Sequence, residues 1–187
     1  MIISFFNLRY VWVFSSQDSK IPLGKIYDVI INPENLIILA FWIRTPRGLK
    51  VLLVRDILFF NGRRVEISSV RDLAEARGIP ALNKIFAKEC PIINAKVYAG
   101  KTKKSRFIGV VKDFLLNSVA PTVLNIRVKK GCFFFAKNYL ISRAKIHKVT
   151  KKGVFLTGEA FLRPIKWKKI NLGRNKVIVD NCKERGK

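Results

Sequence analysis

Gly24-Lys-Ile-Tyr-Asp-Val-Ile-Ile-Asn32 and Gly109-Val-Val-Lys-Asp-Phe-Leu-Leu-Asn117 are two versions of one stretch of sequence, 85 positions apart. Glycine, aspartate and asparagine coincide in the two copies, and the apolar positions correspond closely. A turn, a second apolar strand, a glycine turn and a third strand follow each copy. These later strands are expected at Leu36–Ile43 and Leu49–Val54 in one copy, and at Thr122–Val128 and Cys132–Ala136 in the other. An ordered series of this kind predicts an internal duplication.

The duplicated unit has the pattern of a small β-barrel. Each copy begins with a strand, Tyr10–Phe14 or Ala95–Ala99, and its short strands are separated by Gly, Pro, Asn or Ser turns. Closing such a sheet into a barrel removes its exposed edges. We therefore expect an all-β fold with short connecting helices and two tandem small β-barrels. Helix formers in Val70–Arg77 and Ala81–Lys88 predict short helices between the copies. The expected domains are a first barrel (1–77), a helical connector (78–90), a second barrel (91–160) and a basic C-terminal extension (161–187).

The first copy resembles a known module. Gly24-Lys25-Ile26-Tyr27-Asp28-Val29, a turn, an apolar strand and then Val54-Arg55-Asp56-Ile57 look like the PRC-barrel, the small barrel of the photosynthetic reaction centre H subunit and of the ribosome maturation factor RimM. The resemblance covers roughly residues 8–70, and more weakly 92–158, where Asn138-Tyr139-Leu140 replaces the acidic strand-end motif. It implies PRC-like barrels and a role in protein or ribosome association, not catalysis. One barrel hosts unrelated roles, so the resemblance alone does not assign a function.

The two repeated aspartates do not predict a catalytic carboxylate pair. Asp28 and Asp113 occupy the same position of separate copies and have no reason to face each other, so we expect each to make structural hydrogen bonds to a neighbouring turn or backbone amide. Gly24 and Gly109 are expected at turn positions that need a positive φ. Neither copy carries a phosphate-loop pattern.

The remaining chemistry-bearing residues also give no constellation for an enzyme. His147, the single histidine, is expected to be exposed on a strand, with no nearby carboxylate to orient it as a general base. Cys90, Cys132 and Cys182 show neither a disulfide framework nor metal-ligand spacing. Buried thiols in a reducing, cytoplasmic compartment fit this usage. We expect no catalytic activity, no cofactor and no metal.

The charge of the chain is extreme and uneven. The formal net charge of +25 comes from 37 Lys and Arg against 12 Asp and Glu. Residues 1–90 hold 13 basic and 8 acidic residues, whereas residues 91–187 hold 24 and 4. Charge of one sign destabilises a compact state, so an anionic partner is expected, either nucleic acid or an anionic membrane. A uniformly basic proteome is the alternative, and the asymmetry between the halves weakens it.

Basic residues of the second half cluster at expected turns, which meet at the rims of a closed barrel. If the clusters converge, they would form a patch that neutralises phosphates. A lysine-rich rim that serves only solubility is the alternative. Trp167 lies among three lysines and is the candidate for stacking on a base. The candidate nucleic-acid-binding residues are Lys101, Lys103, Lys104, Arg106, Lys129, Lys130, Lys151, Lys152, Lys166, Trp167, Lys168, Lys169, Arg174 and Lys176.

Two hypotheses of function follow. The first is a non-enzymatic adaptor whose basic second half contacts RNA, in one version ribosomal RNA, while the first barrel contacts a protein. The second is a scaffold at the cytoplasmic face of an anionic membrane or in a division-like assembly. No apolar run reaches about 18 residues, so no transmembrane segment is expected.

Overall fold

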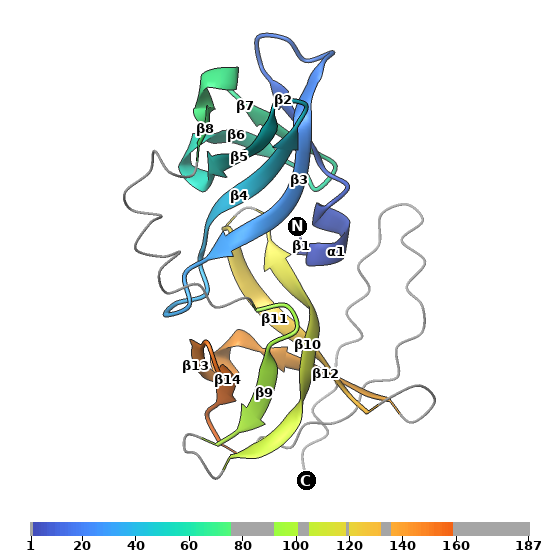
Figure 1. Cartoon of the computed structure of the whole chain (residues 1–187), viewed down its shortest axis with the longest axis vertical. Coiled ribbons are helices and arrows are strands. Elements are labelled where there is room, and N and C mark those ends of the chain that lie inside the picture. The colour runs from blue at the N-terminus through green and yellow to red at the C-terminus, as the bar shows by residue number, and fades with distance from the viewer. Residues whose placement is uncertain (1, 76–91, 101–104, 119, 132–135, 159–187) are drawn as a thin grey trace, which may run out of the picture.

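The structure, a computed structural model, describes residues 2–75, 92–100, 105–118, 120–131 and 136–158. Two curled, half-barrel sheets lie one above the other in Figure 1. In the described ranges the helical elements are a single α-helical turn, α1 (Phe5–Leu8), and three short 3-10 turns, η1 (Val54–Asp56), η2 (Val70–Asp72) and η5 (Arg143–Lys145). The prediction of an all-β fold with short helices is confirmed.

The first sheet has the strand order β6-β7-β2-β3-β4-β5-β8. Its neighbours are antiparallel except β2 and β7, which are parallel. The bounds are β2 (Trp12–Ser15), β3 (Pro22–Ile31), β4 (Ile38–Thr45), β5 (Gly48–Leu53), β6 (Ile57–Phe60), β7 (Arg64–Ile67) and β8 (Leu73–Ala74).

The second sheet repeats this order as β13-β14-β9-β10-β11-β12, again with one parallel pair, β9 with β14. The bounds are β9 (Lys96–Ala99), β10 (Arg106–Asn117), β11 (Thr122–Lys130), β12 (Lys137–Ser142), β13 (Ile146–Thr150) and β14 (Gly153–Leu156). The repeat seen in the sequence is therefore present in the strand pairing as well.

The register of the two long hairpins is the same residue by residue. Asp28 of β3 pairs with Trp42, and Asp113 of β10 pairs with Arg127, so both positions follow the offset of 85 residues. A β-bulge directly precedes each aspartate. A bulge bends the strand and disrupts its hydrogen-bond ladder locally, and at this point each aspartate accepts a hydrogen bond from the next backbone amide.

The two repeated glycines lie within strands and not in turns, so that expectation was wrong. A Cβ on Gly24 would lie 2.5 Å from the carbonyl oxygen of Arg44, and one on Gly109 would lie 2.5 Å from that of Lys129. The close approach of the neighbouring strand therefore requires glycine at both positions, and only Gly109 has a positive φ.

The N-terminal segment joins the second sheet. β1 (Ile2–Ser4) pairs antiparallel with Leu115–Asn117 of β10, and α1 lies beside the same strand at the waist of the molecule (Figure 1). The ring of Phe5 stacks on that of Phe114 with centroids 4.8 Å apart. Residues that precede the first repeat thus complete the second one.

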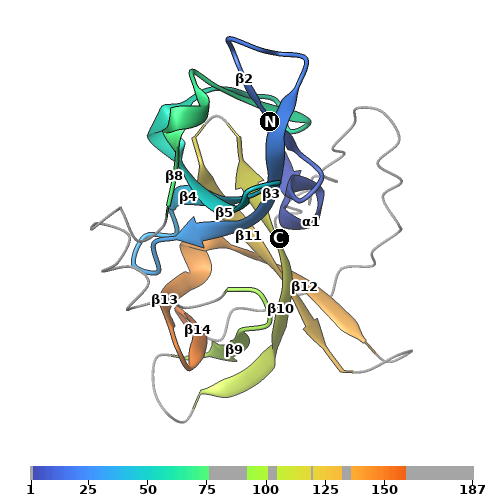
Figure 2. The same cartoon turned by 45° about the horizontal axis from the view of Figure 1, so that its top comes forward.

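The hairpin turns of the two repeats also meet. Ile37 and Thr122 form an isolated antiparallel bridge, and the Ile38 amide donates to the Pro121 carbonyl at 2.8 Å. Figure 2 shows β3, β4, β10 and β11 gathered at this junction. Buried residues of both sheets form one continuous hydrophobic cluster, so the repeats share a core.

Three details of the predicted organisation differ from the structure. Val70–Arg77 forms only the turn η2 before Leu73–Ala74 pairs with β5, so the predicted helix is wrong in its described part. The strand that pairs with β11 is Lys137–Ser142 and not Cys132–Ala136, of which residues 132–135 lie outside the described residues. The 3-10 turn Arg143–Lys145 corresponds to the 3-10 turn Val54–Asp56 of the first repeat. Lys145 therefore takes the place of Asp56, and the predicted correspondence with Asn138-Tyr139-Leu140 is wrong.

Several further predictions fall outside the described residues. They are the helix at 81–88, the whole connector at 78–90, the extension at 161–187, and Cys90, Cys132 and Cys182. Of the helices that the structure describes, none has the length and apolar character needed to cross a bilayer.

Candidate nucleic-acid interface

The described part of the second repeat carries almost no negative charge. Between residues 92 and 158 it holds twelve Lys and Arg and a single carboxylate, Asp113, which is only 6% exposed. Residues 2–75 hold ten basic and seven acidic residues, and the ion pairs Lys50–Glu75, Arg55–Asp56 and Arg64–Glu66 lie there. The second sheet therefore presents cations that no exposed carboxylate of its described residues neutralises.

Five of the candidate residues lie in the described ranges. Arg106 begins β10, Lys129 and Lys130 end β11, and Lys151 and Lys152 form the turn between β13 and β14. The candidates outside the described residues are Lys101, Lys103, Lys104, Lys166, Trp167, Lys168, Lys169, Arg174 and Lys176.

Strand register brings part of this set together. Val110 pairs with Lys129 on one side and with Lys96 on the other, so Lys96 and Lys129 lie in one row across β9, β10 and β11. Val154 pairs with Val97, which places the Lys151–Lys152 turn at the Lys96 end of β9. Arg106 pairs with Ala99 at the opposite end of β9, apart from these lysines.

Lys96 and Lys112 belong to the same surface and were missed by the sequence reasoning, which looked for charges in turns. Lys96 is exposed on β9, and the Lys112 ammonium donates to the Asn94 side-chain carbonyl at 3.0 Å. Asn94 precedes Lys96 by two residues, so this hydrogen bond brings Lys112 to the Lys96 end of β9. We call Lys96, Lys112, Lys129, Lys151 and Lys152 the lysine cluster.

A row of aromatic side chains runs beside the lysine cluster. Phe107 of β10 pairs with Tyr98 of β9, Tyr98 pairs with Phe155 of β14, and Phe155 pairs with Lys148 of β13. The ring centroids lie 5.9 Å apart for Phe107 and Tyr98, and 5.4 Å apart for Tyr98 and Phe155. The Lys148 ammonium lies 5.5 Å from the centroid of the Phe155 ring. Phe107, Tyr98 and Phe155 are called the aromatic row below.

The aromatic row lies on the outer face of the sheet. The strand neighbours Val97, Ile108 and Val154 are buried in the core, so the alternating side chains of Tyr98, Phe107 and Phe155 point away from it. Tyr98 and Phe155 are half-buried, and Phe107 is 42% exposed. This face thus combines accessible rings with nearby cations.

The repeated aspartates serve the backbone, as the sequence indicated. The Asp28 carboxylate accepts from the Val29 amide at 2.8 Å, and the Asp113 carboxylate accepts from the Phe114 amide at 2.9 Å and the Phe6 amide at 3.4 Å. Burial raises the pKa of both carboxyl groups, against the opposing effects of these hydrogen bonds and of Arg9 or Arg127. Asp113 therefore holds the start of α1 on the second sheet.

His147 is exposed on β13, as expected. Within the described ranges no three His, Cys, Asp or Glu side chains gather in a way that could hold a metal ion. No protein-family model and no curated protein matches this chain.

Proposed function

We propose that this protein is a non-enzymatic adaptor that binds RNA through its second repeat and a protein through its first. The observation that carries the proposal is the segregation of charge, with twelve cations and one buried carboxylate in the described part of the second repeat. Lysines on one face neutralise phosphates and release their counterions, and this supplies most of the affinity of non-specific nucleic-acid binding. Ribosomal RNA is the form of this partner that the PRC-barrel resemblance favours.

The RNA contact is tested by replacing two lysines of one row. Lys96→Gln with Lys129→Gln removes the two cations of the lysine cluster that flank Val110 in one row. We expect RNA binding to weaken at least about ten-fold, because a hydrogen bond to a charged group contributes about 1.5 kcal/mol or more. Lys20→Gln with Arg47→Gln removes the same charge from exposed positions of the first repeat and serves as the control. Equal losses in both double variants would show that bulk charge, and not this surface, binds RNA.

Contact with a protein through the first repeat is supported by exposed apolar side chains on a sheet edge. β6 begins the strand order of the first sheet, and its Leu58 and Phe59 are 63% and 48% exposed. Exposed edges and apolar side chains are the features that partner proteins cover. We expect Leu58→Lys with Phe59→Lys to reduce co-sedimentation with purified ribosomal subunits while naked RNA is bound as before. Unchanged co-sedimentation would remove β6 from the proposed contact.

A further inference from the structure

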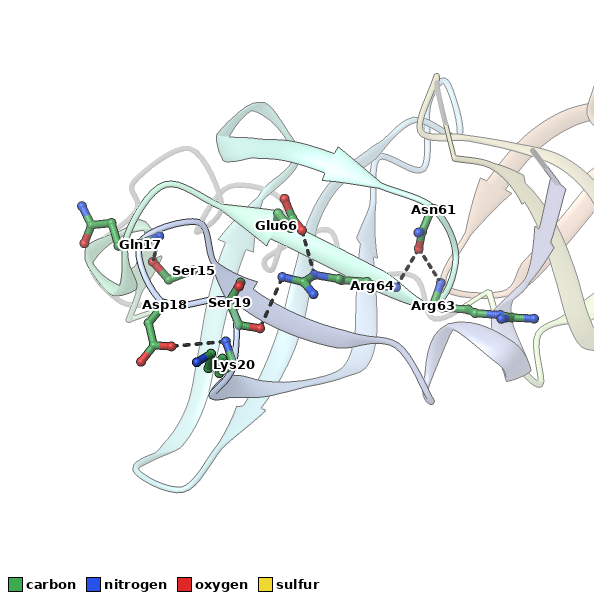
Figure 3. A network of polar contacts seen from close by, with 9 residues as sticks. All are labelled: Ser15, Gln17, Asp18, Ser19, Lys20, Asn61, Arg63, Arg64 and Glu66. Carbon is green, nitrogen blue, oxygen red and sulfur yellow. Dashed lines mark hydrogen bonds and ion pairs between the residues drawn. The ribbon is translucent and has the colours of Figure 1, made fainter.

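The aromatic row has a counterpart in the first repeat, and there its central ring is covered. The corresponding row, set by the same strand pairing, is Pro22, Phe14, Glu66 and Phe59. The Arg64 guanidinium lies over the Phe14 ring, 4.2 Å from its centroid. It is held there by the Glu66 carboxylate at 2.8 Å and by the Ser19 carbonyl at 3.4 Å, as Figure 3 shows.

The second repeat lacks that cover from its own strand. Val13 pairs with Val65 in the first repeat, and Val97 pairs with Val154 in the second. Arg64 directly precedes Val65 and Gly153 directly precedes Val154, so Gly153 occupies the position of Arg64. A Cβ at Gly153 would overlap the Lys96 carbonyl oxygen and lie 3.2 Å from the Tyr98 ring, and its φ is +139°. Gly153 therefore supplies no side chain beside Tyr98 at the position that the Arg64 guanidinium fills over Phe14.

The groups around the aromatic row favour an anionic, planar ligand. Lys148 lies at its Phe155 end, and Lys96 lies two residues before Tyr98 on the same face, about 6.8 Å along the strand. Glu66, the carboxylate of the first row, is replaced by Phe155. Exposed rings beside cations are the arrangement with which proteins stack unpaired bases while they neutralise the phosphates between them.

We propose that the aromatic row is a stacking platform for the bases of single-stranded RNA, with Lys96 and Lys148 contacting the phosphates. The proposal rests on the RNA binding proposed above and narrows it to single strands, because the bases of a duplex are already stacked on one another and cannot reach the rings.

Phe107 is the residue to change, because its exposure lets it be truncated without loss of the core. In the full chain, Phe107→Ala should weaken binding of a uridine-rich single strand by about 5-fold to 150-fold, the range for loss of one base stack. Binding of a duplex of equal length should be unchanged. Phe107→Trp should retain single-strand binding, since it keeps an aromatic face. Tyr10→Ala, which removes an aromatic side chain that is 75% exposed and lies outside both proposed contacts, is the control and should have no effect.

A second measurement identifies the contact directly. Photo-cross-linking of a single strand that contains 5-iodouridine should join the base to the peptides of Phe107 or Tyr98, and the label should fall with Phe107→Ala. If Phe107→Ala bound the single strand as well as the wild type does, and the cross-links fell on other peptides, the stacking platform would be overturned and the proposed RNA contact would stand. Wild-type protein that binds neither single strand nor duplex would overturn both proposals.

Discussion

Gly153 of β14 occupies the position in the second repeat that Arg64 of β7 occupies in the first. Arg64 covers an aromatic ring and is fixed by Glu66, whereas Gly153 brings the backbone against Lys96 and supplies no side chain to cover Tyr98. One fold thus carries two different outer faces. In the first repeat the Arg64–Glu66 ion pair covers the Phe14 ring, and in the second repeat the corresponding row presents rings beside lysines.

The shared core predicts that the repeats unfold together. Phe5 precedes the first repeat, but its ring is 2% exposed and stacks on Phe114 of the second sheet. We expect Phe5→Ala to lower the free energy of unfolding by about 3–5 kcal/mol, as for other buried phenylalanines. Urea unfolding followed by circular dichroism should show one transition that moves to lower denaturant. Phe6→Ala is the control, because Phe6 is 48% exposed, and it should cost less than about 1 kcal/mol. Two separate transitions in the wild type would contradict the shared core.

Asp113 should stabilise the fold through the hydrogen bonds that its oxygen atoms accept more than through its charge. Asp113→Ala leaves the amides of Phe6 and Phe114 without their acceptor, at a cost of about 1–3 kcal/mol for each such buried group. Asp113→Asn keeps an acceptor and removes a carboxylate whose burial raises its pKa, so we expect at most a small loss of stability. The urea midpoints of the two variants measure this difference. If both variants lost the same stability, the charge itself would be the important feature.

The raised pKa of Asp113 gives a pH dependence of defined sign. The folded protein holds this proton more tightly than the unfolded chain, whose carboxyl has the ordinary value of 3.8. The stabilisation is therefore complete below that value and is lost as the pH rises through the folded-state pKa. Wild type should gain stability relative to Asp113→Asn when unfolding is measured at pH 4 instead of pH 7. A difference that stays constant, or changes in the opposite direction, would contradict the burial of this group.

Short sequence patterns predicted the long strands and their duplication. The spacing of Gly24, Asp28 and Asn32, repeated at Gly109, Asp113 and Asn117, marked the two long strands and their duplication. The role of the glycines was misread, because the close approach of a neighbouring carbonyl leaves no trace in the sequence of the strand itself. Helix propensity in Val70–Arg77 was overridden by the pairing of Leu73–Ala74 with β5.

The missed features depend on pairing between distant segments. Ile2–Ser4 carries nothing that identifies its partner strand more than a hundred residues away. The aromatic row needs the parallel pairing of β9 with β14, which joins Tyr98 to Phe155 across the whole second repeat. Reasoning from charge runs therefore pointed to Trp167 and the turns, and overlooked a face that exists only once the sheet is formed.

The salt dependence of RNA binding tests the central claim most directly. The affinity of the full chain for a single-stranded RNA should be measured by fluorescence anisotropy from about 50 to 200 mM salt, a range over which phosphate contacts lose most of their affinity. We predict that the logarithm of the association constant falls linearly with the logarithm of the salt concentration. Lys96→Gln with Lys129→Gln should make this negative slope shallower by about 2. Phe107→Ala should lower the affinity without changing the slope. Absent binding at low salt, or binding that salt does not weaken, would contradict the proposal that the second repeat binds RNA.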